Sequence, residues 1–130
     1  MKAKQKILGN SMNAIIYCRV STLEQAESGY SLASQEKICV QYANKNGYKV
    51  LEVFIEKGES AKSIRRTELK RLLQFISNKK NAVRVIIVYK LDRLSRDLVD
   101  YTSLTRLFSE LGIEISYGKY RWNSDRKTYE

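Results

Sequence analysis

Residues 83–89 read VRVIIVY, the most apolar of the short β-branched runs in the sequence. A continuous apolar run of this length is typical of a strand that is buried on both faces of a parallel sheet. Three other runs have strand character, at 14–18 (AIIYC), 48–55 (YKVLEVFI) and 113–117 (IEISY). We therefore expect residues 83–89 to lie in the middle of a sheet formed with these three runs.

Helical patterns separate the four runs. Residues 31–47 carry an apolar face and end at Gly47, residues 67–76 carry a second, and a third extends from residue 94 to Gly112. The apolar positions are Leu32, Ile38, Cys39, Tyr42 and Ala43; Leu69, Leu72, Leu73 and Ile76; and Leu94, Leu98, Tyr101, Leu104, Phe108 and Leu111. This alternation predicts an α/β domain, with a mostly parallel four- to five-stranded sheet flanked by helices in a flavodoxin-type three-layer arrangement.

Length and charge limit the possibilities further. The chain has 130 residues, which suits one domain, and its 24 Lys and Arg against 14 Asp and Glu leave a formal net charge of +10. Such an excess favours a polyanionic partner such as nucleic acid, although a basic surface without a partner is the alternative. The sequence lacks an apolar run long enough for a membrane span, so we expect a cytoplasmic protein.

The segments outside the periodic core are polar. Residues 1–13 form a basic leader that we expect to be flexible, and residues 56–66 (EKGESAKSIRR) are expected to form a mobile loop. Residues 118–130 form a basic tail, which is either a frayed end or the start of a truncated C-terminal element. We therefore place the folded domain at residues 14–117.

The sequence contains no histidine and only two cysteines, Cys18 and Cys39. Ser-His and Cys-His nucleophilic pairs are therefore excluded, as is the commonest zinc ligand. Both cysteines lie in apolar segments, which favours buried, reduced thiols over a disulfide or a metal site. Any chemistry must rest on Ser, Tyr, Arg, Lys or carboxylate groups.

Polar side chains follow three of the strands where each one ends. In an open α/β sheet, ligands bind outside the carboxyl ends of the strands, so these side chains should share one edge. They are Arg19, Ser21, Thr22 and Gln25 after the first strand; Glu56, Lys57, Ser60, Lys62, Arg65 and Arg66 after the second; and Lys90, Asp92, Arg93, Ser95 and Arg96 after the third. Arginines and hydroxyls from distant segments thus converge on one edge.

Two of these groups have a functional and a structural interpretation. Arg19 and Ser21 are two residues apart on a strand, so their side chains point to the same side. The arginine could therefore hold a phosphate in the position that the serine oxygen attacks. The structural alternative is helix capping, because Ser21 to Glu24 and Thr22 to Gln25 both fit a capping box. Two arginines, at 93 and 96, oppose the dipole at a helix start, and either a bound anion or simple solvation could account for them.

Three motifs together resemble one family. YCRVSTLEQ (17–25), EKGESAKSIRRTEL (56–69) and YKLDRLSR (89–96) look like the catalytic domain of the serine recombinases, which include resolvases, invertases and large serine integrases and transposases. The resemblance covers about residues 14–117, with the motifs in the family's order and spacing. SGYSLASQ (28–35) is more similar to the large serine recombinases than to the small resolvases.

This resemblance implies a mechanism. Ser21 would attack a DNA phosphodiester, form a 5′-phosphoserine link and release a 3′-hydroxyl. The arginines around the scissile phosphate would be Arg19, Arg66, Arg93 and Arg96, oriented by Asp92 and supported by Gln25, Tyr17, Glu56 and Ser60. The family needs no metal or cofactor. The base that deprotonates the serine stays open among Asp92, a neighbouring arginine and water.

The resemblance also implies partners. Members act on double-stranded DNA as dimers that pair into a synaptic tetramer, and they continue into a long helix and a separate DNA-binding domain, so we expect a fragment or a truncated copy that recombines DNA inefficiently alone. The chain departs from the family at Ala61, where glycine is usual, at Thr67, where proline is usual, and at Lys57, where an acid is common. These departures concern the loop and leave the inferred nucleophile in place.

Three other functions compete with this hypothesis. A metal-dependent nuclease could use Glu56 and Asp92 to hold Mg²⁺. A non-catalytic module could bind nucleic acid through the basic edge. A flavodoxin-like partner protein would have no site of its own. Covalent attachment of the protein to a 5′ DNA end in the presence of EDTA would separate the recombinase from all three.

Overall fold

A computed structural model describes residues 12–21, 32–58, 67–89, 98–118, 122–123 and 128–129 of the chain. Four parallel strands form one sheet in the order β3-β2-β4-β5. They are β2 (Asn13–Ser21), β3 (Lys49–Gly58), β4 (Val83–Val88) and β5 (Glu114–Tyr117). Strand β4 has a neighbour on each side, as its apolar sequence predicted, and the parallel sheet confirms the expected fold class.

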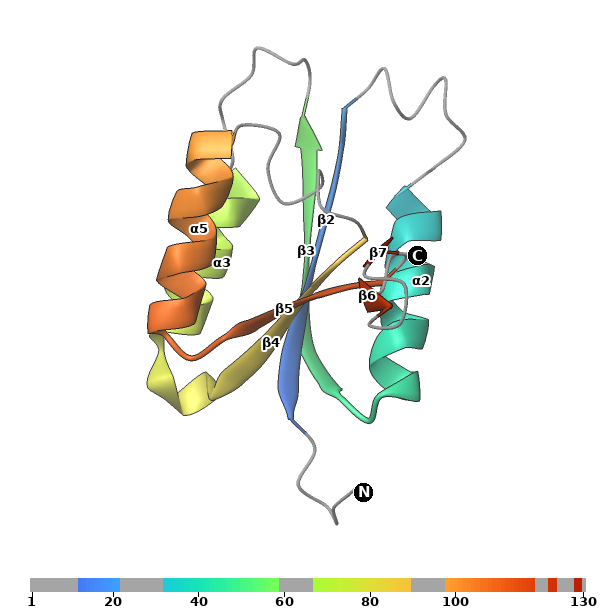
Figure 1. The fold of residues 1–130 in the computed structure, drawn as a ribbon, viewed down its shortest axis with the longest axis horizontal. Coiled ribbons are helices and arrows are strands. Elements are labelled where there is room, and N and C mark those ends of the chain that lie inside the picture. Colours follow the sequence, from blue (N-terminus) through green and yellow to red (C-terminus); the bar gives the residue numbers. More distant parts are fainter. Residues whose placement is uncertain are drawn as a thin grey trace.

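Helices cover both faces of this sheet (Figure 1). The helix α2 (Leu32–Lys45) lies on one face, and α3 (Thr67–Ser77) and α5 (Leu98–Glu110) lie on the other; a short 3-10 turn, η1 (Lys79–Asn81), precedes β4. None of the described helices is long and apolar enough to cross a membrane. The molecule therefore has the three layers that the alternating pattern predicted.

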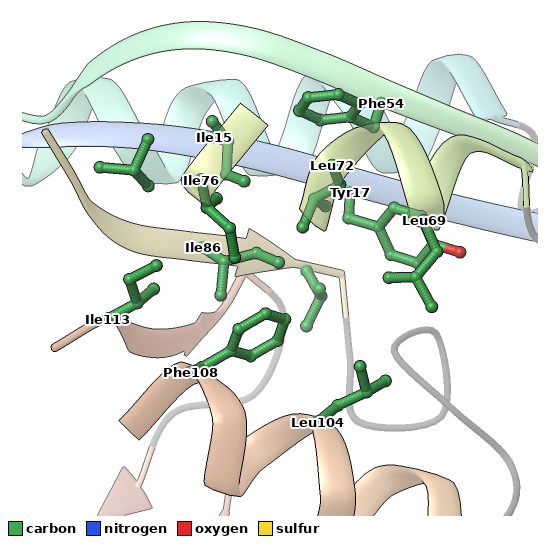
Figure 2. Close-up of a cluster of buried hydrophobic side chains, with 12 residues drawn as sticks. Ile15, Tyr17, Phe54, Leu69, Leu72, Ile76, Ile86, Leu104, Phe108 and Ile113 are labelled. Atoms are coloured by element: carbon green, nitrogen blue, oxygen red, sulfur yellow. The ribbon is translucent and has the colours of Figure 1, made fainter. Parts of the chain in front are cut away.

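Each face of the sheet has its own hydrophobic cluster. On the face of α3 and α5, strand residues such as Ile15 and Ile86 pack against Leu72 of α3 and Phe108 of α5 (Figure 2). On the face of α2, alternate strand residues such as Ile16 and Ile87 pack with residues of α2. Successive residues of β2 and β4 thus enter different clusters, as the two-residue period of a strand requires.

The strand order creates a topological switch point. The chain runs from β2 outward to β3, and then returns across β2 to β4 on its other side. Strand β2 is followed along the chain by its neighbour on one side, and β4 by its neighbour on the other. In open α/β sheets, ligands bind outside the carboxyl ends of the two strands at which the order reverses in this way. This edge is where a ligand is expected.

Two of the strands extend further at their C-terminal ends than the sequence predicted. The predicted strand 14–18 extends to Ser21, and the predicted strand 48–55 extends to Gly58, so the loop expected at 56–66 begins at least three residues later. The cause is the parallel ladder, which pairs Arg19 with Glu56 and Ser21 with Gly58. Backbone pairing with a neighbouring strand outweighs the polar character of these side chains, which sequence patterning cannot register.

Two helices end as their glycines predicted. At the end of α2, Gly47 has φ +72°, Tyr48 N–H donates to the Ala43 carbonyl, and Gly47 N–H donates to Asn44. The end of α5 repeats this pattern with Gly112 at φ +75°. Both are Schellman motifs, which need a residue that tolerates the left-handed region. One prediction fails here: Leu111 lies beyond α5 and is exposed, although it was assigned to the apolar face.

The last described residues form two short strands, β6 (Trp122–Asn123) and β7 (Thr128–Tyr129), which pair antiparallel. The polar sequence of residues 118–130 did not predict them. Just before them, Gly118 N–H donates to the Val88 carbonyl at 2.8 Å. A Cβ at position 118 would come within 3.4 Å of Ile38 and 3.5 Å of the Cys39 sulfur, so this glycine allows a close approach to α2.

Candidate active site

Ser21 is the last residue of β2 and lies opposite Gly58, the last residue of β3. Among the described residues, the ladder between β2 and β4 ends at Tyr17 and Val88, whereas the ladder between β2 and β3 continues to Ser21 and Gly58. Ser21 does not cap α2, which begins at Leu32. The two capping boxes predicted from Ser21 and Thr22 run into residues that lie outside the described part of the chain.

Arg19 stands two residues before Ser21 on the same strand and is half-buried. Tyr17 belongs to the cluster beneath α3 and α5, and the two-residue period of the strand puts Arg19 on this same face. The ladder pairs Arg19 with Glu56 on β3, and paired residues of a parallel ladder share a face. An arginine and a carboxylate therefore lie side by side just below the carboxyl edge of the sheet.

Glu56 is a buried carboxylate, only 6% exposed, whose two oxygens accept three hydrogen bonds. Oε1 accepts the Tyr17 hydroxyl at 3.1 Å and the Leu69 N–H at 3.1 Å, while Oε2 accepts the Glu68 N–H at 3.2 Å. The two N–H groups belong to the first turn of α3, which has no partners for them within the helix. Glu56 therefore caps α3 from a neighbouring strand and places a negative charge at the positive end of its dipole.

This carboxylate connects three elements. Through Tyr17 it fixes β2, the strand that ends in Ser21, and through Glu68 and Leu69 it fixes the start of α3. Arg66 directly precedes α3 in the sequence. The position of the serine strand and that of the first turn of α3 are thus set by the same side chain.

The same hydrogen bonds argue against the nuclease alternative. Binding Mg²⁺ through Glu56 would compete with these hydrogen bonds, because Oε1 already accepts two of them and Oε2 accepts a backbone N–H. A buried donor that loses its partner costs about 1–3 kcal/mol. Within the described ranges, no group of three or more His, Cys, Asp or Glu residues is arranged to hold a metal ion.

A row of side chains crosses the sheet below the arginine. The ladders align Phe54, Tyr17, Val88 and Tyr117 on the face of α3 and α5. The Tyr117 hydroxyl lies 3.0 Å from the hydroxyl of Tyr101 on α5. Sequence reasoning placed Tyr101 on an apolar helix face and missed this polar pair, because the register between β4 and β5 has no sequence signal. These four residues form a packed layer next to Arg19 and Glu56 on the same face of the sheet.

Between β2 and α2 lie two cysteine thiols and a buried glutamine. Cys39 of α2 and Cys18 of β2 are buried free thiols, as expected from their apolar context. A hydrogen bond with Cys18, together with burial, raises the pKa of the Cys39 thiol above its ordinary value. One turn before Cys39, Gln35 is buried, and in the described part of the chain neither of its side-chain polar atoms has a hydrogen-bond partner.

Six of the predicted site residues lie outside the described residues: Gln25, Ser60, Arg66, Asp92, Arg93 and Arg96. Ser21 is described by its backbone. The structure brings together Tyr17, Arg19, Glu56 and the backbone of Ser21. The roles given to all the predicted site residues, these four included, stay predictions.

Comparison with known proteins was made against families, curated sequences and solved structures. The family model for the resolvase N-terminal domain matches residues 14–128. The N-terminal catalytic domain of TP901-1 integrase is 38% identical, with a TM-score of 0.70, over 80% of this chain and 76% of that one. A protein of Bacillus phage phi105, the uncharacterized immunity region protein 3, is 41% identical over 64 residues, 49% of this chain and 78% of its own length.

A putative DNA recombinase of Bacillus subtilis strain 168 is 39% identical over 85 residues. This match takes in 65% of the present chain but only 16% of that protein. The match to the family model extends over nearly the whole chain, and the fold has the strand order and helical layers described above. The chain belongs to the resolvase N-terminal domain family, which comprises the catalytic domains of the serine recombinases.

Proposed function

We propose that this chain cleaves and rejoins double-stranded DNA through a covalent 5′-phosphoserine intermediate at Ser21. The observation that carries the proposal is the position of Ser21, at the open end of β2 beside the switch point, two residues from Arg19. Membership of the serine recombinase catalytic-domain family supports it.

In the proposed reaction, the Ser21 oxygen attacks the phosphorus of a DNA phosphodiester. A bond forms between the serine oxygen and phosphorus, and the bond from phosphorus to the 3′-oxygen breaks. The serine proton passes to a base, which stays open, and the departing 3′-oxygen takes up a proton to become a free hydroxyl. Because the new phosphoester retains the energy of the broken bond, the hydroxyl of another end can reverse the step without ATP.

Charge stabilisation is the main task of the surrounding residues. Phosphoryl transfer depends on positioning and on stabilising charge that develops on the phosphate oxygens. In our proposal Arg19, Arg66, Arg93 and Arg96 surround the phosphate, Asp92 orients them, and Gln25 and Ser60 support the site. A guanidinium suits this task because it remains charged and can donate two parallel hydrogen bonds.

Tyr17 and Glu56 are proposed to act beneath the reacting groups. Their hydrogen bond, and those from the start of α3 to Glu56, give the serine strand and the residue before α3 one common anchor. A fixed relative position is what a near-attack geometry needs, since small displacements of reacting groups reduce rates strongly. The anchor carries its own negative charge near Arg19, which would keep that guanidinium close to the edge.

We further propose double-stranded DNA as the partner, with homodimers that pair into a tetramer when two DNA sites meet, and a location on nucleoid DNA in the cytoplasm. The net charge of +10 supports a polyanionic partner, because each phosphate that is neutralised releases counterions. In this proposal residues 14–117 are the catalytic domain, and residues 1–13 and 118–130 lie outside it.

The test is a search for the covalent intermediate. The chain is incubated in EDTA with short DNA duplexes of random sequence that carry a mismatched central step, and SDS-resistant protein–DNA adducts are isolated. We expect attachment to 5′ ends, loss of the adduct in Ser21→Ala, and an unchanged adduct in Ser103→Ala, which alters an exposed serine on α5. Digestion of the adduct should yield phosphoserine in the peptide that contains residue 21.

Two results would contradict the proposal. Cleavage that appears only with Mg²⁺ and leaves no adduct would indicate a nuclease. Retention of DNA without an adduct, equal in the parent protein and in Ser21→Ala, would indicate a module that only binds nucleic acid.

A further inference from the structure

The hydroxyl pair of Tyr101 and Tyr117 is a polar contact that the proposed reaction does not yet use. The two oxygens lie 3.0 Å apart in a partly buried setting, and either one could be the donor. Tyr101 lies in the first turn of α5, and Tyr117 is the last residue of β5. Both rings pack against the hydrophobic cluster on the face of α3 and α5, where phenylalanine would pack equally well. The two hydroxyls therefore add a directional contact to the burial of the rings.

This contact restrains the beginning of α5. Further along the helix, Leu104 and Phe108 are buried in the same cluster (Figure 2). Burial of apolar surface is non-directional, whereas a hydrogen bond weakens steeply as its distance and angle depart from the preferred values. The hydroxyl pair therefore restrains the first turn of α5 more closely than apolar packing does.

The hydroxyl pair belongs to the same row of the sheet as the hydrogen bond between Tyr17 and Glu56. The ladders align Tyr117 with Val88, and Val88 with Tyr17. Tyr17 donates to Glu56, which caps the first turn of α3. Both α3 and α5 begin toward the carboxyl ends of the strands (Figure 1). Each of these two helices is thus tied at its first turn to one row of the sheet through the hydroxyl of a strand tyrosine.

The first turn of α5 limits where the backbone of Arg96 can lie. In the sequence Arg96 comes two residues before Leu98, the first residue of α5. Two peptide units span at most about 7.6 Å between Cα atoms, so a shift of the first turn displaces the point to which Arg96 is attached. The proposed reaction needs this guanidinium at the scissile phosphate, and small misplacements of such groups reduce rates strongly.

We propose that Tyr101 is a positioning residue, whose hydroxyl pairs with that of Tyr117, fixes the first turn of α5 and thereby holds Arg96 at the scissile phosphate. This inference rests on the proposed function. Tyr101 acts through α5 and does not touch the DNA. Its part for α5 corresponds to the part that Tyr17 and Glu56 have for α3.

The decisive variant is Tyr101→Phe, which removes one oxygen and keeps the ring. In single-turnover adduct formation at saturating protein, it should lower the rate about tenfold, whereas non-covalent DNA affinity should stay within about twofold. The unfolding midpoint should fall by no more than about 5 °C, because one partly buried hydrogen bond is lost. Tyr117→Phe should lower the rate by the same factor, and the double variant should lower it no further, since each change removes the same hydrogen bond.

A second pair of measurements tests whether Tyr101 acts through Arg96. When Arg96→Ala is already present, Tyr101→Phe should change the rate less than about twofold, because the side chain that it positions is gone. When Arg19→Lys is present instead, Tyr101→Phe should still lower the rate about tenfold. A general loss of structure would lower the rate in both backgrounds.

A matched control lies on the same helix. The Thr105 hydroxyl donates to the Thr102 carbonyl at 2.9 Å, so this hydrogen bond lies within α5. Thr105→Val removes it and leaves the contact between α5 and β5 in place. The rate of adduct formation in Thr105→Val should therefore stay within about twofold of the parent.

The outcomes separate this inference from the proposed function. If the parent protein forms no adduct that depends on Ser21, the proposed function is wrong. If the parent forms the adduct and Tyr101→Phe forms it equally fast, only the role of Tyr101 is wrong. If rate and DNA affinity fall by the same factor, the hydroxyl serves DNA binding and not the position of Arg96. An equal loss of rate from Tyr101→Phe with and without Arg96→Ala would also overturn the inference.

Discussion

At the scale of single residues, the buried carboxylate of Glu56 links β3 to both β2 and α3. This carboxylate accepts hydrogen bonds from two N–H groups in the first turn of α3, which have no partners within the helix, and from the Tyr17 hydroxyl. We expect Glu56→Gln to lower the free energy of unfolding by about 2–3 kcal/mol, because a side-chain amide puts an N–H group where a donor already points. Urea unfolding measures this decrease.

The controls for this prediction are close at hand. Tyr17→Phe removes one of the three hydrogen bonds and should cost about 1 kcal/mol, less than Glu56→Gln. Glu110→Gln changes an exposed carboxylate at the end of α5 and should stay within about 0.5 kcal/mol of the parent. Equal effects of Glu56→Gln and Glu110→Gln would show that the capping hydrogen bonds add nothing to stability.

The sequence pointed to Glu56 as a possible supporting residue but did not predict its cap on α3. The residue type and its place after a strand were visible in the motif, whereas its cap on α3 depends on hydrogen bonds between elements that are more than ten residues apart. The same limit hid Gln35, since a buried glutamine has no signature in the helical period. Residues whose role depends on local pattern, such as Gly47 and Gly112, were predicted correctly.

At the scale of elements, α5 is attached to the sheet mainly through Leu104 and Phe108, which are buried in the cluster of Figure 2. Phe108→Ala should lower the free energy of unfolding by about 3–5 kcal/mol, because it removes a ring from a packed interior and leaves a cavity. Val99→Ala on the exposed side of the same helix should change it by less than about 0.5 kcal/mol. A similar decrease for both would contradict the assigned orientation of α5.

The packing of α2 on β2 should make stability sensitive to alkaline pH. The folded pKa of Cys39 is raised above its ordinary value of 9.0 by the hydrogen bond with Cys18 and by burial. Well below pH 9 the Cys39 thiol is protonated in both the folded and the unfolded chain, so its contribution to the free energy of unfolding is fully present. Above pH 9 the unfolded chain releases this proton first, so the free energy of unfolding should fall by up to about 1.4 kcal/mol per pH unit.

Denaturant unfolding from pH 7 to pH 10.5 tests this sign. Cys39→Ser should abolish the contribution of this thiol, so its stability should decline less steeply with pH than that of the parent. Burial also raises the pKa of Tyr48, so a smaller decline should remain in the variant above pH 10. Parallel curves for the two proteins would show that Cys39 does not couple folding to pH.

At the scale of the whole molecule, the patterning of apolar residues predicted the layers and the parallel sheet, because burial on both faces leaves a periodic record in the sequence. Strand ends were predicted less well, since pairing between distant segments extended β2 and β3 through polar residues. The edge that we propose to be functional therefore lies where sequence patterning predicts structure least well. In our proposal the catalytic arginines lie at this edge, whereas exposed Arg84 lies near the start of β4, at the other end of the strand.

If the proposal is right, this difference in position separates charge that serves catalysis from charge that only attracts DNA. Arg93→Ala and Arg96→Ala should each lower the single-turnover rate of adduct formation by about 10²–10³, the effect of removing one preorganised donor to developing charge. Their DNA affinity should fall less than about tenfold.

Arg84→Ala removes the same charge far from the edge and should leave the rate of adduct formation unchanged, so the DNA affinity of this variant measures the contribution of net charge alone. Affinity titrated against salt should then give slopes that differ by about 0.9 for each phosphate that a variant no longer neutralises. Equal decreases of rate and affinity in Arg93→Ala and Arg96→Ala would mean that these arginines hold the duplex and do not act on the scissile phosphate.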